Sequence, residues 1–422
     1  MTYKKKVLKN GLRIIAVPMK GSPSVTVMSL IEAGSKYENK QNNGISHFLE
    51  HMCFKGTDKR LKAIDISREF DAMGAQNNAF TSSEVTGYWG KAHNKHTDKL
   101  LDIISDMYLH PTFPEADLET EKGVIVEEIN MYEDLPQSLV QEVFSGLLYG
   151  DQPAGWSIAG TKENVCGFKR EDFVNYRKNN YVAEATTIVI AGDINEKDIF
   201  KKVTKAFVGI SENKKASKKK VVEKQNEPMI KLRFKETDQT HLVIGVRAFN
   251  LYDKRVPALG LFSTVLGNGM SSRLFQKMRG ELGICYYVRS SAEELTDHGM
   301  FTISAGVDST RVLQGIKGIL EEMIKIRDEK IPESELRKAK DYMIGNMYLG
   351  LESSSAQANF FGFQEIMKEK IKTPKELEKE IEKITAEDLF KVAKEIITNK
   401  RLNMAIVGKY KDAERFKNIL KV

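Results

Sequence analysis

Residues 47–51 read HFLEH, and this stretch is the most informative feature of the chain. Two histidines four positions apart project from the same side of an α-helix, so His47 and His51 can both reach one metal ion. Glu50 lies one turn from His47 on that side. The order H-x-x-E-H inverts the commoner H-E-x-x-H motif of zinc hydrolases. The stretch therefore predicts a helix that carries two metal ligands and a carboxylate.

The residues around HFLEH support an amphipathic helix. An apolar stripe for packing is formed by Ile45, Phe48, Leu49 and Met52. The opposite face carries His47, Glu50, His51 and Phe54. Cys53 points away from the histidine face, so we expect it in the core rather than on the metal. The alternative is a surface helix that carries His and Glu at this spacing by chance, because the chain has seven histidines.

A third ligand is predicted 77 positions after His51, with 76 residues between the two, within a second helix at 118–135. Its inward stripe consists of Leu118, Glu121, Ile125, Glu128, Ile129 and Tyr132. Carboxylates on an apolar face are costly unless they are paired or bind metal. Glu128 is therefore the predicted ligand, and Glu121 is predicted to orient a ligand histidine. Glu127 is the competing candidate, but its face carries Thr120, Gly123 and Asp134 and is predicted to be solvated.

Three segments carry a longer pattern: HFLEHMCFKGT at 47–57, NAFTSSEVT at 78–86 and EKGVIVEEINMYED at 121–134. With the 76-residue gap, these segments resemble the pitrilysin/insulinase family of zinc peptidases in its short, processing-peptidase-like form. The resemblance implies Zn²⁺ on His47, His51 and Glu128, with Glu50 as the general base. It also implies an open strand edge at Asn78, Ala79, Phe80 and Thr81 that binds an extended peptide through its main chain.

The segment SSRLFQKMRGELGICYYV at 271–288 is similar to the part of this family that supplies an arginine and a tyrosine to the active site. By position these residues are Arg279 and Tyr286. The reading GELGICYYV departs from the usual family pattern, and its paired tyrosines leave Tyr287 as the alternative to Tyr286. The resemblance implies that both side chains act on the substrate from the second half of the chain.

The implied activity is a zinc-dependent metalloendopeptidase that hydrolyses unfolded or extended peptides inside a closed chamber. The resemblance also suggests a homodimer, or a heterodimer with a related chain. The alternative function is a non-catalytic structural or partner subunit of the same family. Such members generally lose zinc ligands, whereas this chain keeps every predicted ligand, the base and the Arg-Tyr pair.

An internal duplication gives the domain organisation. EDF at 171–173 recurs as EDL at 387–389, and IVIAGD at 188–193 recurs as MAIVGK at 404–409, both at an offset of 216 residues. Strands followed by helices in each half predict two α+β domains, each a largely antiparallel sheet with packed helices, that form a clamshell. We expect a metal-binding catalytic domain at 1–212, a Lys-rich linker at 213–227 and a homologous domain without metal at 228–422. The metal motif is not duplicated, since Asn346 stands near the place of Glu128.

Composition narrows the remaining possibilities. The net charge of +7 is concentrated between Lys201 and Lys224 and at the amino terminus, with no nucleic-acid motif beside it, so we expect no nucleic-acid partner. Three isolated cysteines argue for a reducing compartment. No apolar run approaches the roughly 18 residues of a membrane span, and the Asn10-Gly11 pair predicts a hairpin rather than a signal peptide. We therefore expect a cytoplasmic protein with no membrane partner.

Overall fold

The structure is a computed structural model that describes residues 1–368 and 370–422. The chain divides into two compact units. The first consists of Met1–Ile129, Ser157–Lys219 and Tyr348–Pro374. The second consists of Asn130–Trp156, Lys220–Met347 and Lys375–Val422. Each unit is built around one β-sheet with helices packed on it, so the predicted α+β class is confirmed.

The first unit contains a six-stranded sheet in the order β1-β2-β6-β3-β5-β4. Its strands are β1 (Lys4–Val7), β2 (Arg13–Pro18), β3 (Ser24–Ile31), β4 (Gln76–Thr81), β5 (Thr86–His93) and β6 (Thr186–Gly192). β1 and β2 form the predicted antiparallel hairpin, and Gly11 takes a φ of 90° in its turn. β4 pairs only with β5 within the sheet order, so it is an edge strand, as predicted for residues 78–81.

The second unit contains a five-stranded sheet in the order β7-β11-β8-β10-β9. Its strands are β7 (Met229–Phe234), β8 (Gln239–Arg247), β9 (Cys285–Glu294), β10 (Gly299–Asp308) and β11 (Leu402–Gly408). β11 runs parallel to β7 and antiparallel to β8, as β6 runs parallel to β2 and antiparallel to β3. The two sheets thus share one connectivity, which is what a duplication at an offset of 216 residues requires.

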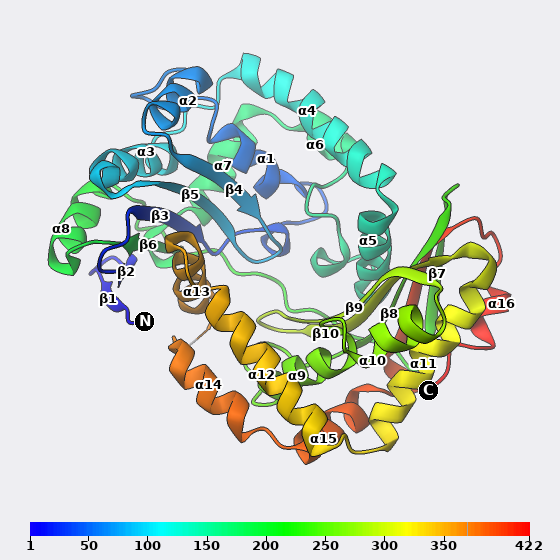
Figure 1. The fold of residues 1–422 in the computed structure, drawn as a ribbon. Coiled ribbons are helices and arrows are strands. Elements are labelled where there is room, and N and C mark those ends of the chain that lie inside the picture. The colour runs from blue at the N-terminus through cyan, green and yellow to red at the C-terminus, as the bar shows by residue number, and fades with distance from the viewer. Residues whose placement is uncertain (369) are drawn as a thin grey trace. The chain divides into compact units, whose positions relative to one another are not determined.

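Helices cover both faces of the first sheet (Figure 1). On one face, Leu12, Ile14 and Val27 pack in a core with α1 (Ile45–Met52), α3 (Thr97–Leu109) and α8 (Glu196–Ala206). On the other face, Met28 and Leu30 pack against α13 (Ser354–Met367). Successive residues of a strand point to opposite faces, so a strand buried on both sides reads as a continuous apolar run.

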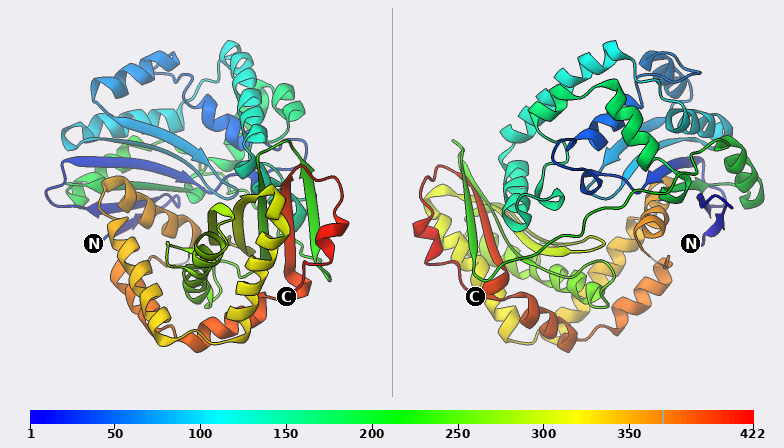
Figure 2. Two further views of the ribbon diagram at one scale, coloured as in Figure 1. Left: turned by 45° about the vertical axis from the view of Figure 1, so that its right-hand side comes forward. Right: turned by 180° about the vertical axis from the view of Figure 1, so that it is seen from behind.

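The second sheet is covered in the same way (Figure 2). One face packs on α9 (Val256–Gly267), α11 (Val312–Asp328) and α15 (Ala386–Ile396). The other face packs on α5 (Pro136–Tyr149), where Phe144 lies against Val243 and Ala405 in a separate cluster. The remaining helices are α2 (Ala63–Ala72), α4 (Glu115–Asp134), α6 (Lys162–Gly167), α7 (Arg170–Asn180), α10 (Arg273–Phe275), α12 (Glu333–Leu349), α14 (Pro374–Lys383) and α16 (Glu414–Lys417).

Two helices are exchanged between the halves of the chain. α5 comes from the first half but packs on the sheet of the second unit, and α13 comes from the second half but packs on the sheet of the first. The compact units therefore differ from the ranges 1–212 and 228–422 by the segments 130–156 and 348–374. The predicted domain ranges and their separate roles stay predictions. The helix exchange is the point at which the compact units differ from those ranges.

The Lys-rich segment at 213–227 contains no helix or strand. It is not uniformly solvated, because Lys215 pairs with Glu32 at 2.9 Å and Lys218 pairs with Glu84 at 2.5 Å. These ion pairs fix the first part of the linker on the first unit. Within the described residues, every helix is too short or too polar to cross a bilayer.

Replacing Phe144 by alanine should destabilise the second unit by about 3–5 kcal/mol, because the buried ring would leave a cavity against the sheet. The ring lies so close to Gly245 that a Cβ at that position would be 2.6 Å from its Cζ atom. Hydrogen exchange should become faster in β8 and β11 and stay unchanged in β3 and β6. The exposed Gln137→Ala change on the same helix is the control. Faster exchange in the first sheet instead would contradict the assignment of α5 to the second unit.

Candidate metal centre

The helix α1 carries the predicted metal motif, and its start is fixed by a buried carboxylate. Glu38 accepts hydrogen bonds from the backbone N–H groups of Gly44 and Ser46, at 2.9 and 2.8 Å. These are first-turn N–H groups that have no partner within the helix. Burial raises the pKa of Glu38 although these bonds oppose the shift. Gly44 precedes the helix with a φ of 100°, a conformation that glycine adopts without strain.

The apolar stripe of α1 packs as predicted. The buried residues on this side of the helix are Ile45, Phe48, Leu49, Met52 and Cys53. Phe48 makes edge-on contacts with Phe168 and Phe173. Since this face is held in the core, the face with His47, Glu50 and His51 is directed toward α4.

His47, His51 and Glu128 converge between α1 and α4. The Nε2 atoms of the two histidines each lie 3.6 Å from Glu128 Oε2, and one donor atom from each residue lies within 4.8 Å of the others. A separation of 3.6 Å is too long for a hydrogen bond. Zinc bonds of about 2.0–2.1 Å in a tetrahedron separate neighbouring ligand atoms by about 3.3–3.4 Å. The distances between the donor atoms therefore suit binding to a common metal ion better than hydrogen bonding among the three side chains.

The two imidazoles differ in their surroundings. Burial, followed by the nearby charge of His51, lowers the pKa of His47 to about 4, so this ring is neutral and keeps a lone pair for a metal. Burial also lowers the pKa of His51, but the hydrogen bond to Glu121 and the neighbouring carboxylates outweigh it, and the net pKa is raised. His51 Nδ1 lies 2.9 Å from Glu121 Oε1. A carboxylate only accepts, so Nδ1 carries the proton and Nε2 faces Glu128.

Glu121 thus occupies the place predicted for a residue that orients a ligand histidine. Glu121 is 5% exposed and also forms an ion pair with Lys55, whose Nζ lies 2.5 Å from Oε2. Burial raises the pKa of Glu121, but its bonds to His51 and Lys55 outweigh burial and lower it. The sequence prediction omitted Lys55. Lys55 lies beyond the end of α1 at Met52, in a turn, so helical spacing gave no signal for it.

Glu50 lies beside the two histidines on α1. Thr81 Oγ1 donates a hydrogen bond of 2.6 Å to Glu50 Oε2. Burial raises the pKa of Glu50, and the Thr81 bond and the charge of His51 reduce the shift. Glu127 is exposed and is not part of the group formed by Glu128 and the histidines. The predicted inward position of Tyr132 is wrong, because this side chain is 38% exposed near the end of α4.

The edge strand β4 presents its backbone in an alternating pattern. The Ser82 N–H donates to Val85 O across the hairpin, at 2.8 Å. Alternation in an antiparallel pair then turns the backbone groups of Phe80 and Asn78 toward β5 and those of Thr81, Ala79 and Asn77 toward the open edge. Asn78 Oδ1 accepts from the Ala79 N–H at 2.9 Å, so an incoming peptide would replace this contact. The Phe80 ring points to the other face, where it stacks on Phe363 of α13 at 5.5 Å.

Arg279 and Tyr286 belong to the second unit. Arg279 lies in a π-helical turn at Gln276–Glu281, with its guanidinium 5.5 Å from the centre of the Tyr286 ring at the start of β9. Tyr286 is 75% exposed. The Tyr287 hydroxyl instead lies 3.0 Å from His241 Nδ1 and is engaged within its own unit. Of the two tyrosines, Tyr286 has the hydroxyl that is open to solvent.

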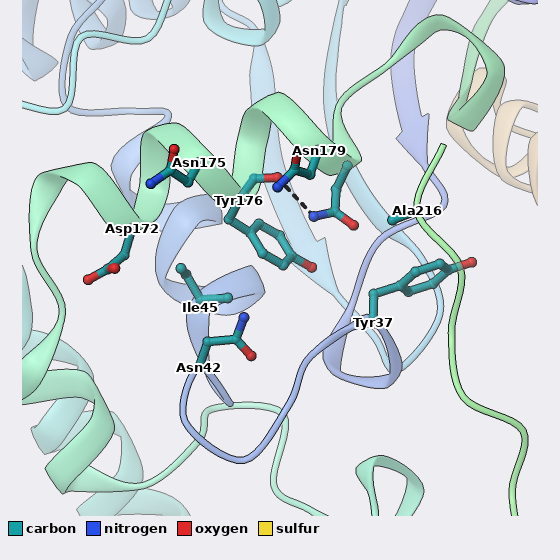
Figure 3. A pocket seen from close by; sticks show the side chains of 9 residues that line it. Tyr37, Asn42, Ile45, Asp172, Asn175, Tyr176, Asn179 and Ala216 are labelled. Carbon is teal, nitrogen blue, oxygen red and sulfur yellow. Dashed lines mark hydrogen bonds between the residues drawn. The ribbon is translucent and has the colours of Figure 1, made fainter. Parts of the chain in front are cut away.

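A cavity of about 320 Å³ lies at the start of α1, away from the histidines. Figure 3 shows its polar lining, with Asn42 beside α1 and Asn175 and Asn179 on α7. Tyr37 and Ala216 lie on its far side. None of its lining residues is a predicted ligand or the predicted base, so this cavity is separate from the metal group.

A helix with an inverted H-x-x-E-H motif, a third ligand on a second helix and a duplicated α+β fold define a class of metallopeptidase. Comparison with known proteins agrees. The family described as insulinase (peptidase family M16) matches residues 13–162, and the peptidase M16 inactive domain matches residues 167–343. The chain belongs to peptidase family M16, the insulinase family.

Several relatives resemble the chain over nearly its whole length. An uncharacterized zinc protease of Bacillus subtilis, YmxG, is 35% identical over 94% of this chain and 96% of that protein. An uncharacterized zinc protease of Rickettsia bellii is 32% identical over 95% of this chain and 96% of that protein. The crystal structure of a protease from Helicobacter pylori superposes with a TM-score of 0.90 at 23% identity, covering 96% of this chain and 99% of that one. The last similarity shows the shared fold, and the relatives' names support a peptidase.

If the group formed by His47, His51 and Glu128 binds metal, the purified chain should carry about one zinc per monomer. Substitutions of residues that only contact the ligands usually lower metal affinity by roughly ten- to hundredfold. Glu128→Gln changes a ligand itself, so it should lower zinc affinity by more than that. The adjacent Glu127→Gln is the matched control and should change zinc affinity little, because that carboxylate is exposed outside the group. Competition with a chromogenic chelator measures both. The opposite ranking would move the ligand to Glu127.

Proposed function

We propose that the chain is a zinc-dependent metalloendopeptidase that hydrolyses unfolded or extended peptides. The observation that carries the proposal is the convergence of His47, His51 and Glu128 with Glu50 beside them. Three protein ligands suit a catalytic zinc, whereas structural zinc sites usually have four. The names of the relatives support the same activity.

The chemistry follows from the groups at the site. When bound, zinc supplies a Lewis acid that makes water more acidic and polarises the peptide carbonyl. Glu50 takes a proton from water as the general base and returns it to the leaving amine. Burial raises the pKa of Glu50. A raised pKa suits a carboxylate that must hold the proton between its removal from water and its transfer to the amine.

The substrate would add to the open edge of β4 as a further strand. Its backbone would pair with the edge-facing groups of Asn77, Ala79 and Thr81 and displace the Asn78 side chain from Ala79 N–H. Asn78 could then bond the substrate with its amide. Phe80 would contribute by holding the strand against α13 rather than by touching the peptide. Recognition through backbone groups favours extended chains over folded proteins and predicts loose sequence preference.

Arg279 and Tyr286 complete the proposal through the resemblance of 271–288 to the family. The Tyr286 hydroxyl would donate to the oxyanion that develops at the scissile carbonyl, and Arg279 would anchor the substrate or hold Tyr286 in place. The exposure of Tyr286 and the proximity of the guanidinium to its ring support this pairing. A closed chamber, a dimer with itself or with a related chain and a cytoplasmic location stay predictions.

A non-catalytic subunit of the same family is the competing function. The inactive-domain match covers residues 167–343, which exclude His47, His51 and Glu128. The complete ligand set in the first half therefore favours the enzyme.

Glu50→Gln should keep zinc content and folding but lower peptide turnover by at least about a hundredfold, the usual scale for a general base. Glutamine is nearly the same size and can still accept the Thr81 hydrogen bond. Zinc analysis and cleavage of a quenched peptide before and after chelation measure both effects. Turnover at the wild-type rate in this variant would exclude Glu50 as the base, and a wild-type chain that holds zinc but cleaves no peptide would favour the non-catalytic subunit.

Arg279→Ala and Tyr286→Phe should each reduce cleavage at least about tenfold with zinc content unchanged, because neither side chain is a ligand. Tyr287→Phe is the matched control, since its hydroxyl bonds His241 instead. The quenched-peptide assay with parallel metal analysis compares the three. A loss confined to the Tyr287 variant would transfer the role to that tyrosine.

A further inference from the structure

We propose that Thr81 is a positioning residue that couples the pairing of a peptide at β4 to the orientation of the Glu50 carboxylate. This inference rests on the proposed function and adds a role for a side chain that the edge-strand prediction treats only as backbone. Its starting point is the hydrogen bond of 2.6 Å from Thr81 Oγ1 to Glu50 Oε2.

Thr81 is the last residue of β4 and serves two directions at once. Its backbone N–H and C=O face the open edge, as the Ser82–Val85 hydrogen bond and the alternation of the strand require. Its side chain lies on the face of the sheet that packs against α1. One residue therefore bonds the base through its hydroxyl and offers its backbone to the substrate.

The hydrogen bond fixes a carboxylate that would otherwise turn. The terminal torsion of a glutamate is broad, so its two oxygens exchange places easily. With Oε2 held by Thr81, Oε1 is the oxygen that can accept a proton from water. The donor thus selects one orientation of the base.

The position of Thr81 is itself well determined. The preceding residue, Phe80, stacks on Phe363, and a Cβ at Gly87 would be 2.4 Å from the Phe80 ring. Phe80 therefore anchors the end of β4 on one face of the sheet while Thr81 bonds Glu50 on the other. A β-branched residue has few χ1 rotamers, so the hydroxyl follows the backbone closely. A peptide that orders this edge would order the hydroxyl and the base with it.

The test compares Thr81→Val with Thr81→Ser. Valine keeps the branched shape but removes the donor, whereas serine keeps the donor. For Thr81→Val we expect kcat to fall about ten- to hundredfold, the size expected for a lost hydrogen bond to a charged group, with KM within about twofold of wild type. Zinc content should stay unchanged. Thr81→Ser should recover most of kcat.

A second comparison separates action through Glu50 from other roles. In the Glu50→Gln background, Thr81→Val should cause little further loss, because two residues that act as one unit are not additive. An additive loss, an equal loss in Thr81→Ser, or a rise in KM with kcat unchanged would overturn the proposal. Wild-type kinetics for Thr81→Val with an inactive, zinc-loaded Glu50→Gln variant would reject the role of Thr81 alone. Wild-type kinetics for Glu50→Gln would reject the proposed function as well.

Discussion

The cost of removing charged groups from water governs the first unit around α1 and α4. His47, Glu50, His51 and Glu128 lie close together with most of their surface covered, and two of them are carboxylates that repel each other. Such a group is unfavourable without a compensating positive charge or hydrogen bonds. A divalent cation bound by the three donor atoms would supply that charge.

The surrounding structure holds this unfavourable group in place. α1 is anchored by its apolar face and by Glu38 at its first turn, and α4 brings Glu121 and Glu128 from one side of the helix. Glu121 connects the group to a further positive charge, because its carboxylate contacts both His51 and Lys55. Rigid helices therefore set the ligand geometry, while hydrogen bonds from neighbouring side chains set the orientation of each ring and carboxylate.

Sequence periodicity predicts those parts of the site that lie on single helices. The spacing of His47 and His51, and of Glu121 and Glu128, places each pair on one face of its own helix, and the family resemblance implied that the two faces meet. The bond between Thr81 and Glu50 joins a strand to a helix 31 residues away in the chain, and no local pattern encodes it. Tyr132 shows the opposite failure, because a helical stripe predicts a face but not how far along the helix a neighbour covers it. The destinations of α5 and α13 were unpredictable for a related reason: an apolar helix face fits either of two similar sheets.

The helix exchange also has consequences for fragments of the chain and for folding during synthesis. Each half of the sequence encodes a complete sheet, but the helix that covers one side of that sheet comes from the other half. A fragment ending at the Lys-rich segment would lack α13 and expose the apolar row of Ile15, Val17, Met28, Leu30 and Val189. The C-terminal fragment would likewise lack α5 and expose Val243, Ala405 and Val407. Ribosomal synthesis therefore delivers the strands of the first sheet well before α13, and an apolar sheet face that is exposed during that interval favours aggregation.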